Sequence, residues 1–188
     1  MTATTSQANR VDPDRVFDWV DTHADERRAA GLKRQLRPRP ATSATLDLAG
    51  NDYLGLTRDK RVISAAAAAA LKWGAGSTGS RLVTGSTELH TELELELASF
   101  TGAQAALVFG SGYTANLAAM TALSGQNSAI VADQYIHASL IDGCRLAKAE
   151  VAVVGHCDPT AVGRALAGRT RPRAIVVTES AFSVDGDV

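Results

Sequence analysis

The sequence predicts an α/β fold, in which helices flank a mainly parallel sheet and a helical arm precedes it. The first observation behind this prediction is a regular alternation of short apolar runs and helical stretches between residues 86 and 178. The second is an apolar run at residues 107–109 that ends in a glycine turn and then a helix. The third is an apolar content of 45% over 188 residues, which suffices for the core of one globular domain.

The arm is predicted over residues 1–45. Its first ten residues are expected to be disordered, and Asp12-Pro13-Asp14 makes a favourable helix start. The helix is expected to end near Gly31, and the prolines within residues 37–40 then favour extended chain. One face of the helix carries Val16, Trp19, Val20 and His23.

The main body is predicted over residues 46–188, and a short strand at residues 46–49 opens it. The alanine-rich residues 60–73 favour a helix that Gly74 stops, and a glycine- and serine-rich loop follows. Ser86 can cap a further helix. On that helix leucines recur at four-residue spacing, at Leu89, Leu93 and Leu97.

Strands and helices then alternate to the end of the sequence. Strands are expected at residues 105–109, 129–132, 151–154 and 174–178, and helices at residues 113–124, 138–148 and 158–167. Ligands of a parallel sheet bind at the carboxyl ends of its strands. The residues that follow these strands are therefore the candidates for a functional site.

The composition excludes several classes of protein. With 19 basic and 20 acidic residues the net charge is -1, which argues against a nucleic-acid or membrane-surface partner. Cys144 and Cys157 lie in no disulfide or metal-ligand spacing, so no metal site is expected. No run approaches the roughly 20 apolar residues of a membrane helix, and no signal peptide is recognisable. We expect a cytoplasmic protein that binds small molecules or protein chains.

The turn at residues 110–112 is the first candidate site. A strand that ends in glycines at a helix N-terminus offers free backbone N–H groups and the positive end of the helix dipole, so a phosphate is the expected ligand. The turn lacks the Gly-Lys-Ser/Thr of a Walker loop, whereas Ala115 fits some dinucleotide fingerprints. A nicotinamide-binding domain is therefore an alternative, with Asp133 as the candidate for the ribose.

Two further side chains follow predicted strands at the same edge. The imidazole of His137 could stack on a flat heteroaromatic ring or transfer protons, or it could simply cap the next helix. Ser183 follows the last strand together with Glu179, and it could hydrogen-bond a ring substituent. Alternatively, Ser183 caps the turn that Asp185-Gly186 predicts.

Five segments, in this order and spacing, carry a resemblance to a known family: residues 51–56, 76–81, 111–116, 137–139 and 182–187. They resemble the α-oxoamine synthases, which are pyridoxal-phosphate (PLP) enzymes of the aspartate-aminotransferase fold. The resemblance extends from about residue 27 to the last residue. It implies an incomplete PLP-dependent transferase fold, in which residues 46–188 are the N-terminal part of the large cofactor-binding domain.

The resemblance implies roles for individual residues. It places the cofactor phosphate on the backbone of Gly112 and Tyr113, the pyridine ring against His137, and the ring oxygen near Ser183. It makes His137 a catalytic residue that also contacts substrate. It points to Arg34 in the arm as the contact for a substrate carboxylate, which suits the fork of a guanidinium group.

The implied reaction is the decarboxylative condensation of L-alanine with a pimeloyl thioester, in biotin biosynthesis, by a homodimer. PLP is the electron sink of such a reaction. One alternative is a sister synthase that uses glycine or serine with another acyl-CoA. Another is a non-catalytic fragment that keeps only the phosphate site.

The family also needs a lysine that forms a Schiff base and an aspartate at the pyridine nitrogen, and both are expected beyond Val188, together with the C-terminal domain. None of the four lysines follows a predicted strand; they are Lys33, Lys60, Lys72 and Lys148. The 188-residue chain is therefore expected to be inactive by itself.

Overall fold

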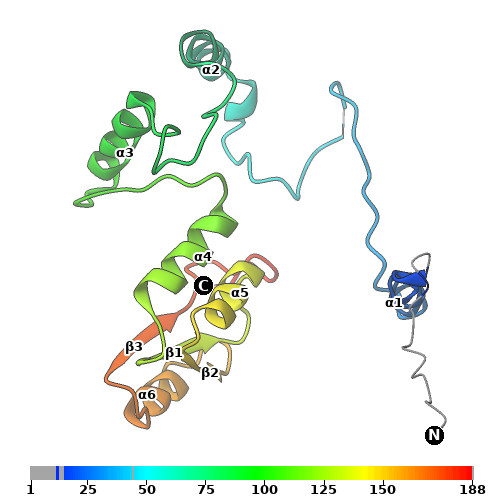
Figure 1. The fold of residues 1–188 in the computed structure, drawn as a ribbon, viewed down its shortest axis with the longest axis vertical. Coiled ribbons are helices and arrows are strands. Elements are labelled where there is room, and N and C mark those ends of the chain that lie inside the picture. The colour runs from blue at the N-terminus through cyan, green and yellow to red at the C-terminus, as the bar shows by residue number, and fades with distance from the viewer. Residues whose placement is uncertain (1–11, 13–14, 44, 188) are drawn as a thin grey trace, which may run out of the picture. The chain divides into compact units, whose positions relative to one another are not determined.

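The structure is a computed structural model that describes residues 12, 15–43 and 45–187. The chain divides into two units, residues 1–64 and residues 65–188, and each is described by itself. Figure 1 shows the course of the chain and labels its elements. The boundary predicted at residue 45, between the arm and the main body, stays a prediction.

Among its described residues the first unit holds the α-helix α1 (Asp18–Ala29), one turn of 3-10 helix, η2 (Leu56–Arg58), and the start of α2 (Lys60–Trp73), which continues into the second unit. Helix α1 begins later than its predicted start at Asp12-Pro13-Asp14, of which only Asp12 is described. The disorder expected for the first ten residues concerns positions outside the described residues. Gly31 adopts a positive φ of 70°, as suits a residue just past a helix end, and confirms the predicted stop.

The strand predicted at residues 46–49 is wrong. The described residues of this unit contain no strand, and the leucines of this segment, Leu46 and Leu48, are largely exposed. The segment instead bends at Leu48 and Ala49. The carboxylate of Asp47 accepts a hydrogen bond from the N–H of Ala49 and pairs with Arg39 at 2.8 Å. Without a neighbouring strand, these local bonds determine the backbone conformation.

Two helices lie between residues 60 and 101. Helix α2 (Lys60–Trp73) has the predicted bounds and is followed by Gly74, whose φ is 89°. Helix α3 (Glu88–Thr101) has Thr87 as its N-cap, so the prediction that Ser86 is the cap is wrong. The hydroxyl of Ser86 instead accepts a hydrogen bond from Arg81 Nε, at 3.1 Å.

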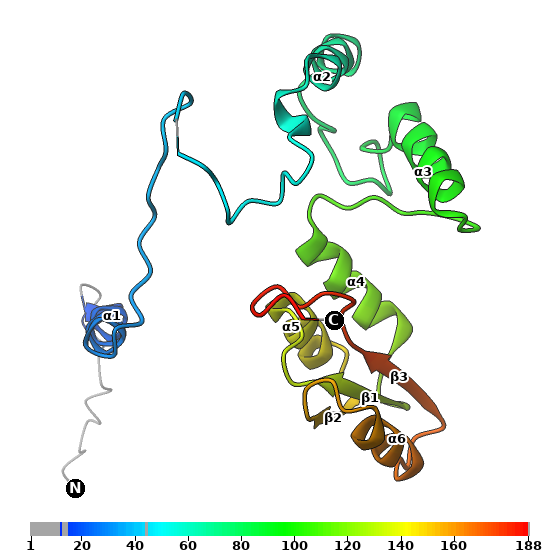
Figure 2. The ribbon, with the colours of Figure 1, turned by 180° about the vertical axis from the view of Figure 1, so that it is seen from behind.

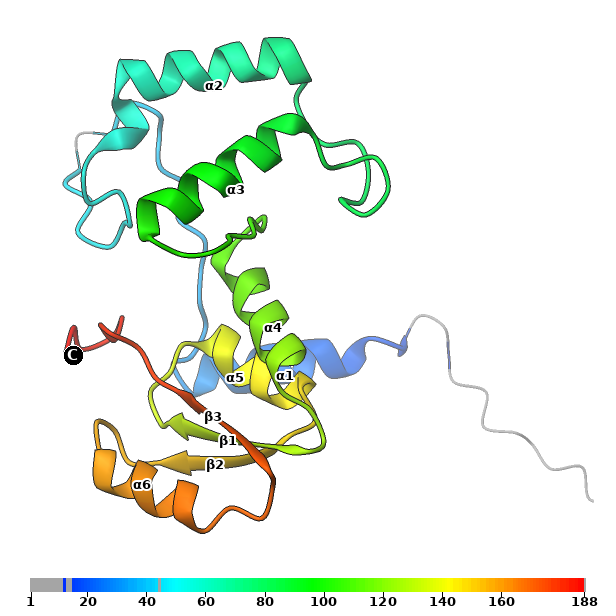
Figure 3. The same cartoon turned by 90° about the vertical axis from the view of Figure 1, so that its left-hand side faces the viewer.

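The sheet has three parallel strands, β1 (Ser128–Asp133), β2 (Glu150–Val154) and β3 (Arg173–Val177), in the order β2-β1-β3. Helices α4 (Gly112–Leu123), α5 (Ala138–Leu146) and α6 (Pro159–Ala167) alternate with them. In Figure 3, α4 and α5 lie on one face of the sheet and α6 lies on the other. This arrangement, seen from behind in Figure 2, confirms the predicted parallel α/β fold.

The strand predicted at residues 105–109 is also wrong, because this extended segment pairs with no strand in the described part of the chain. The polar backbone groups of Val108 have side-chain partners instead. Its N–H donates to Glu94 Oε1 at 2.8 Å, and its carbonyl accepts from Arg81 Nη1 at 3.1 Å. The apolar pattern predicted the extended conformation but carried no information about a partner strand.

The core lies between the sheet and helices α4 and α5. Every residue of β1 is buried, with Ile130 wholly inaccessible to solvent. Around Ile130 and Ala132 pack Met120 of α4, Cys144 of α5, Ala147 at the C-cap of α5, and Val177 of β3. Full burial of the middle strand on both faces is typical of a parallel sheet covered by helices.

Gly143 allows α5 to approach α4 closely. A Cβ at this position would lie 2.8 Å from both Cβ and Cγ of Met120. We expect Gly143→Ala to lower the free energy of unfolding by about 1–3 kcal/mol through overpacking. The matched control is Gly163→Ala on α6, where a Cβ would meet nothing within 4 Å. That variant should gain about 0.5–1 kcal/mol from helix propensity. Urea denaturation measures both, and equal effects of the two substitutions would contradict the role of Gly143.

None of the described helices has the length and apolar character needed to cross a membrane.

Candidate functional site

A cavity of about 780 Å³ lies where the N-termini of α4 and α5 meet the carboxyl end of β3. Its lining includes Gly112, Tyr113 and His137, so the structure brings these three predicted site residues together. Residues 175–181 form its other side. Ser183 does not line this cavity, and Arg34 belongs to the other unit, so their predicted roles stay predictions.

The N-terminus of α4 is built to receive an anion. Ser111 is the N-cap, and its hydroxyl accepts a hydrogen bond from the N–H of Thr114. Within the described part of the chain, no hydrogen bond engages the N–H groups of Gly112 and Tyr113. Two unpaired donors in the first turn, at the positive end of the helix dipole, match the oxygens of a phosphate group.

The side chain of Tyr113 is held away from these donors. Its hydroxyl donates a hydrogen bond to Asp142 on α5, and Asp142 also pairs with Arg145 at 2.9 Å. The hydrogen bond to Asp142 raises the pKa of Tyr113, which therefore remains neutral near pH 7. This bond connects the first turn of α4 to α5, and it holds the Tyr113 side chain in place at the edge of the anion site.

His137 both caps α5 and faces the cavity. Its Nδ1 accepts a hydrogen bond from the N–H of Ser139 at 3.1 Å and lies 2.7 Å from the Ser139 hydroxyl. That hydroxyl is fully buried and accepts a further bond, at 2.9 Å, from Asn116 on α4. Since Nδ1 is an acceptor here, the proton of the neutral imidazole is on Nε2, which makes Nε2–H available to a ligand.

The main chain of His137 is fixed as well. Its N–H donates a hydrogen bond to Glu179, which follows β3. The two alternatives for His137, a helix cap and a ligand contact, are therefore compatible. The backbone N–H and Nδ1 of His137 hold the start of α5 in place, and Nε2 can contact a ligand in the cavity.

Ser183 lies in an exposed turn after β3. The turn is closed by two backbone hydrogen bonds of 2.9 Å, one from Phe182 to the carbonyl of Asp187 and one from Gly186 to the carbonyl of Phe182. Gly186 has a φ of 72°, which confirms the turn predicted from Asp185-Gly186.

Asp133 is occupied in a way that removes it as a ribose contact. It is 7% exposed, and its carboxylate accepts hydrogen bonds from the N–H groups of Tyr135 and Cys157 and from His156 Nδ1, each at 2.8 Å. Burial pushes the pKa of Asp133 upward, but the hydrogen bonds from Tyr135, His156 and Cys157 outweigh it and hold the pKa below its ordinary value. The nicotinamide alternative thereby loses its acidic residue.

His156 and Asp187 were missed by the sequence reasoning. The ring of His156 lies between Asp133 and Asp187, and its Nε2 is 2.5 Å from Asp187. One signal was present in the sequence, because His156 follows β2 by two residues and so reaches the same sheet edge as His137.

The same cluster has the donor types of a metal site. One ligand atom from each of Asp133, His156 and Cys157 lies within 4.8 Å of the others. Both oxygens of Asp133 already accept N–H bonds, however, and the two nitrogens of His156 face carboxylates. The geometry is that of a hydrogen-bonded network.

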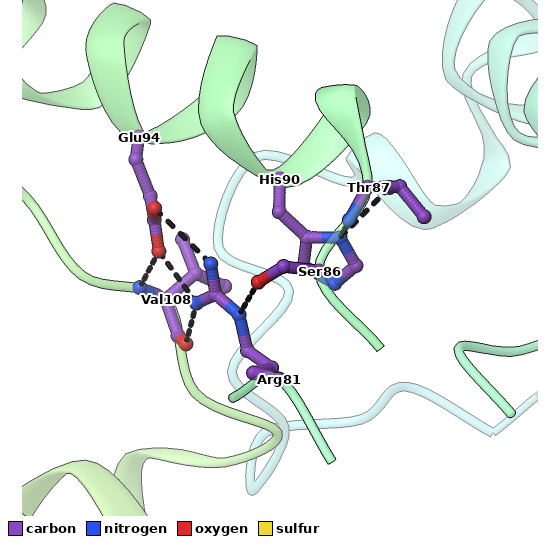
Figure 4. A network of polar contacts seen from close by, with 6 residues as sticks. All are labelled: Arg81, Ser86, Thr87, His90, Glu94 and Val108. Atoms are coloured by element: carbon purple, nitrogen blue, oxygen red, sulfur yellow. Dashed lines mark hydrogen bonds and ion pairs between the residues drawn. The ribbon is translucent and has the colours of Figure 1, made fainter. Parts of the chain in front are cut away.

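A second network holds the segment that leads into the anion site, and Figure 4 shows it. Arg81 forms two bonds to the carboxylate of Glu94, at 2.6 and 3.2 Å, and both residues bond to the backbone of Val108. Nearby, His90 Nδ1 accepts from the N–H of Thr87 at the start of α3. The network fixes Val108, three residues before the N-cap of α4.

This network predicts an acid-sensitive step in stability. The hydrogen bonds from Arg81 and from the Val108 N–H lower the pKa of Glu94 from 4.5 to about 2. A lowered pKa stabilises the folded state above pH 4.5, and that contribution is lost as the pH falls from 4.5 towards 2. We expect Glu94→Gln to flatten this part of the stability curve, measured by urea denaturation at each pH. Glu96→Gln on the same helix is the control, and an unchanged slope in Glu94→Gln would contradict the prediction.

Comparison with known proteins agrees with this geometry. The fold is part of the aminotransferase-type fold of PLP-dependent enzymes. Residues 43–188 match the family described as aminotransferase class I and II, and the chain belongs to this family.

The most informative relatives are 8-amino-7-oxononanoate synthases. The protein of that name from Mycolicibacterium gilvum (strain PYR-GCK) is 60% identical over 170 residues, which are 90% of this chain and 45% of the relative. That of Mycobacterium avium (strain 104) is 56% identical over 168 residues, covering 89% of this chain and 44% of the relative. The chain therefore spans less than half the length of these curated relatives.

Solved structures are similar in the same way. Serine palmitoyltransferase of Sphingomonas wittichii superposes with a TM-score of 0.75 at 29% identity, covering 95% of this chain and 48% of that one. The 8-amino-7-oxononanoate synthase of Francisella tularensis has a TM-score of 0.62 at 30% identity, covering 77% and 40%. A serine palmitoyltransferase from S. paucimobilis with bound PLP-myriocin has a TM-score of 0.78 at 29% identity, covering 95% and 49%.

Proposed function

We propose that the cavity between α4, α5 and β3 binds PLP, with the phosphate at the N–H groups of Gly112 and Tyr113 and the pyridine ring beside His137. The observation that carries this proposal is the presence of two unpaired N–H groups and a fixed imidazole in the lining of one cavity. The family is PLP-dependent, which supports the same assignment. When bound, PLP supplies an electron sink for a carbanion next to the amino group of the substrate.

We further propose that the complete enzyme condenses L-alanine with a pimeloyl thioester, with loss of carbon dioxide, to give 8-amino-7-oxononanoate in biotin biosynthesis. Identities of 55–61% to proteins with the corresponding name support this reaction. The residues that line the cavity support the proposal that PLP binds there, and they do not indicate which acyl group is used. A sister reaction of glycine or serine with another acyl-CoA is the second candidate, supported by the similarity to serine palmitoyltransferase.

In this proposal the residues of the chain bind and orient. The first turn of α4 takes the phosphate charge. The ring of His137 is held by Ser139 and its main chain by Glu179, so His137 restricts the plane in which a flat ring can lie. His137 Nε2–H can donate to an oxygen of the substrate as charge develops there. Arg34 is the proposed contact for a substrate carboxylate and Ser183 that for the ring oxygen.

The decisive experiment is a steady-state assay of the full gene product with four substrate pairs: alanine or glycine, each with a pimeloyl or an acetyl thioester. Release of free thiol with alanine and the pimeloyl thioester alone is the expected result. Preference for glycine with the acetyl thioester would favour a sister synthase. A parallel series of thermal-shift measurements distinguishes the PLP proposal from the nicotinamide alternative. PLP is expected to raise Tm, and NAD is expected to leave it unchanged.

The homodimer and the cytoplasmic location are parts of the same proposal. The resemblance of the five sequence segments to the α-oxoamine synthases supports the dimer. Two free cysteines outside any disulfide spacing fit a reducing compartment. Sedimentation velocity of the full gene product tests the dimer.

A further inference from the structure

His156 joins three segments at the carboxyl side of the sheet in the second unit. It follows β2, its Nδ1 lies 2.8 Å from Asp133 at the end of β1, and its Nε2 lies 2.5 Å from Asp187 in the segment after β3. The ring also packs between Tyr135 and Phe182, with centroid separations of 4.7 and 4.4 Å. The His156 side chain is 17% exposed. Such a residue is a structural link with a defined geometry.

The two ends of this link differ in rigidity. Asp133 ends the fully buried middle strand, and its carboxylate is fixed by the N–H groups of Tyr135 and Cys157. Asp187, with a side chain 41% exposed, closes the surface turn that carries Ser183. The fixed carboxylate of Asp133 therefore holds the imidazole, and the imidazole holds the turn through Asp187.

We propose that His156 is a positioning residue that ties the turn of residues 182–187 to the end of β1 and so sets where Ser183 meets the cofactor ring. The inference rests on the proposed function for the role of Ser183. The link between Asp133, His156 and Asp187 rests on the contacts alone.

The charges at this link determine its pH dependence. Both partners of the imidazole are carboxylates, which only accept, so both ring nitrogens donate and His156 carries a positive charge. Asp133 faces it from β1, Asp187 from the turn, and Tyr135 and Cys157 adjoin the ring. The hydrogen bonds to Asp133 and then to Asp187 raise the pKa of His156 above 6.5. Below pH 6.5 the charged His156 donates to both Asp133 and Asp187. One of these two hydrogen bonds is lost as the pH rises through that raised pKa.

Three substitutions separate the two halves of the link. In His156→Asn the amide nitrogen replaces Nδ1 and reaches Asp133 only. In His156→Gln it replaces Nε2 and reaches Asp187 only. Asp187→Asn keeps the size of the side chain and removes its charge, at a position whose side chain is partly exposed.

The primary measurement is amide hydrogen exchange of Phe182 and Gly186, whose N–H groups close the turn, against amides of the β1 and β3 ladder. The two His156 variants should each lose protection in the turn by about tenfold, the effect of one hydrogen bond, with the ladder unchanged. In the wild type, turn protection should fall above pH 6.5 after correction for intrinsic exchange, and Asp187→Asn should remove that dependence. Equal loss in turn and ladder, or an unchanged turn, would overturn the proposal.

The second measurement compares PLP with inorganic phosphate by calorimetry on the full gene product. In the two His156 variants Ser183 is expected to be displaced. Their affinity for PLP should therefore be about tenfold weaker than that of the wild type, and their affinity for phosphate unchanged. Loss of turn protection without any change in PLP affinity would overturn the positioning role. A wild-type protein that bound neither ligand would instead refute the proposed function, and the exchange data would then decide the link alone.

Discussion

Replacing Gly112 with aspartate is expected to weaken PLP binding by about 100-fold, because the new carboxylate occupies the place of the phosphate and repels its charge of about −2. The helix itself should tolerate the change. A Cβ at Gly112 meets nothing within 4 Å, and an acidic residue in the first turn is favourable for the helix dipole. Binding and folding are thus expected to respond in opposite directions, which calorimetry with PLP and urea denaturation measure separately.

Thr160→Asp is the matched control for this substitution. Thr160 lies in the first turn of α6 and does not line the cavity, so the same charge at a similar helix position should leave PLP affinity unaltered. If Gly112→Asp bound PLP as tightly as Thr160→Asp does, the phosphate would not lie at α4.

Replacing His137 is expected to have the second large effect. His137→Phe keeps a flat ring beside the cavity but loses both the Nδ1 cap of α5 and the Nε2 proton. We expect kcat/KM to fall by about 100-fold or more, in the range usual for loss of a group that donates a proton or hydrogen bond at the reacting atoms. Steady-state kinetics of the full gene product with alanine and a pimeloyl thioester provide the measurement.

A second variant separates capping from chemistry at His137. Asparagine is a good N-cap and can accept from the N–H of Ser139, but it has no aromatic ring. His137→Asn should therefore preserve the stability of α5 and still lose activity. Near wild-type activity in His137→Asn would reduce His137 to a helix cap.

Much of the fold could be predicted from sequence because its signals are local. The glycine after a helix, the alternation of strands and helices, and the turn at Asp185-Gly186 each depend on neighbouring residues only. The failures at residues 46–49 and 105–109 have a common cause. An apolar run predicts extended chain, but a strand also needs a partner, and the backbone of Val108 bonds to Glu94 and Arg81 instead.

The site divides in the same way. The sequence predicted a site at the turn of residues 110–112 and at His137, because the turn precedes a helix and His137 follows a strand. The structure brings Gly112, Tyr113 and His137 into one cavity. The contact of Asn116 with Ser139 joins residues 23 positions apart, and that of His156 with Asp187 joins residues 31 apart. Such pairs become visible only when the sheet brings the strand ends together.

The order of strands in the sheet has a consequence for synthesis on the ribosome. The middle strand β1 is made first, and both of its neighbours follow it, the second ending at Val177. At about 5–20 residues per second, roughly 50 further residues take about 2–10 s to make. Throughout that interval the strand that is fully buried in the folded unit has no partner on at least one edge. Until β3 leaves the exit tunnel, the nascent chain therefore has an unpaired strand edge, whose free N–H and C=O groups can bind chaperones or other unfinished chains.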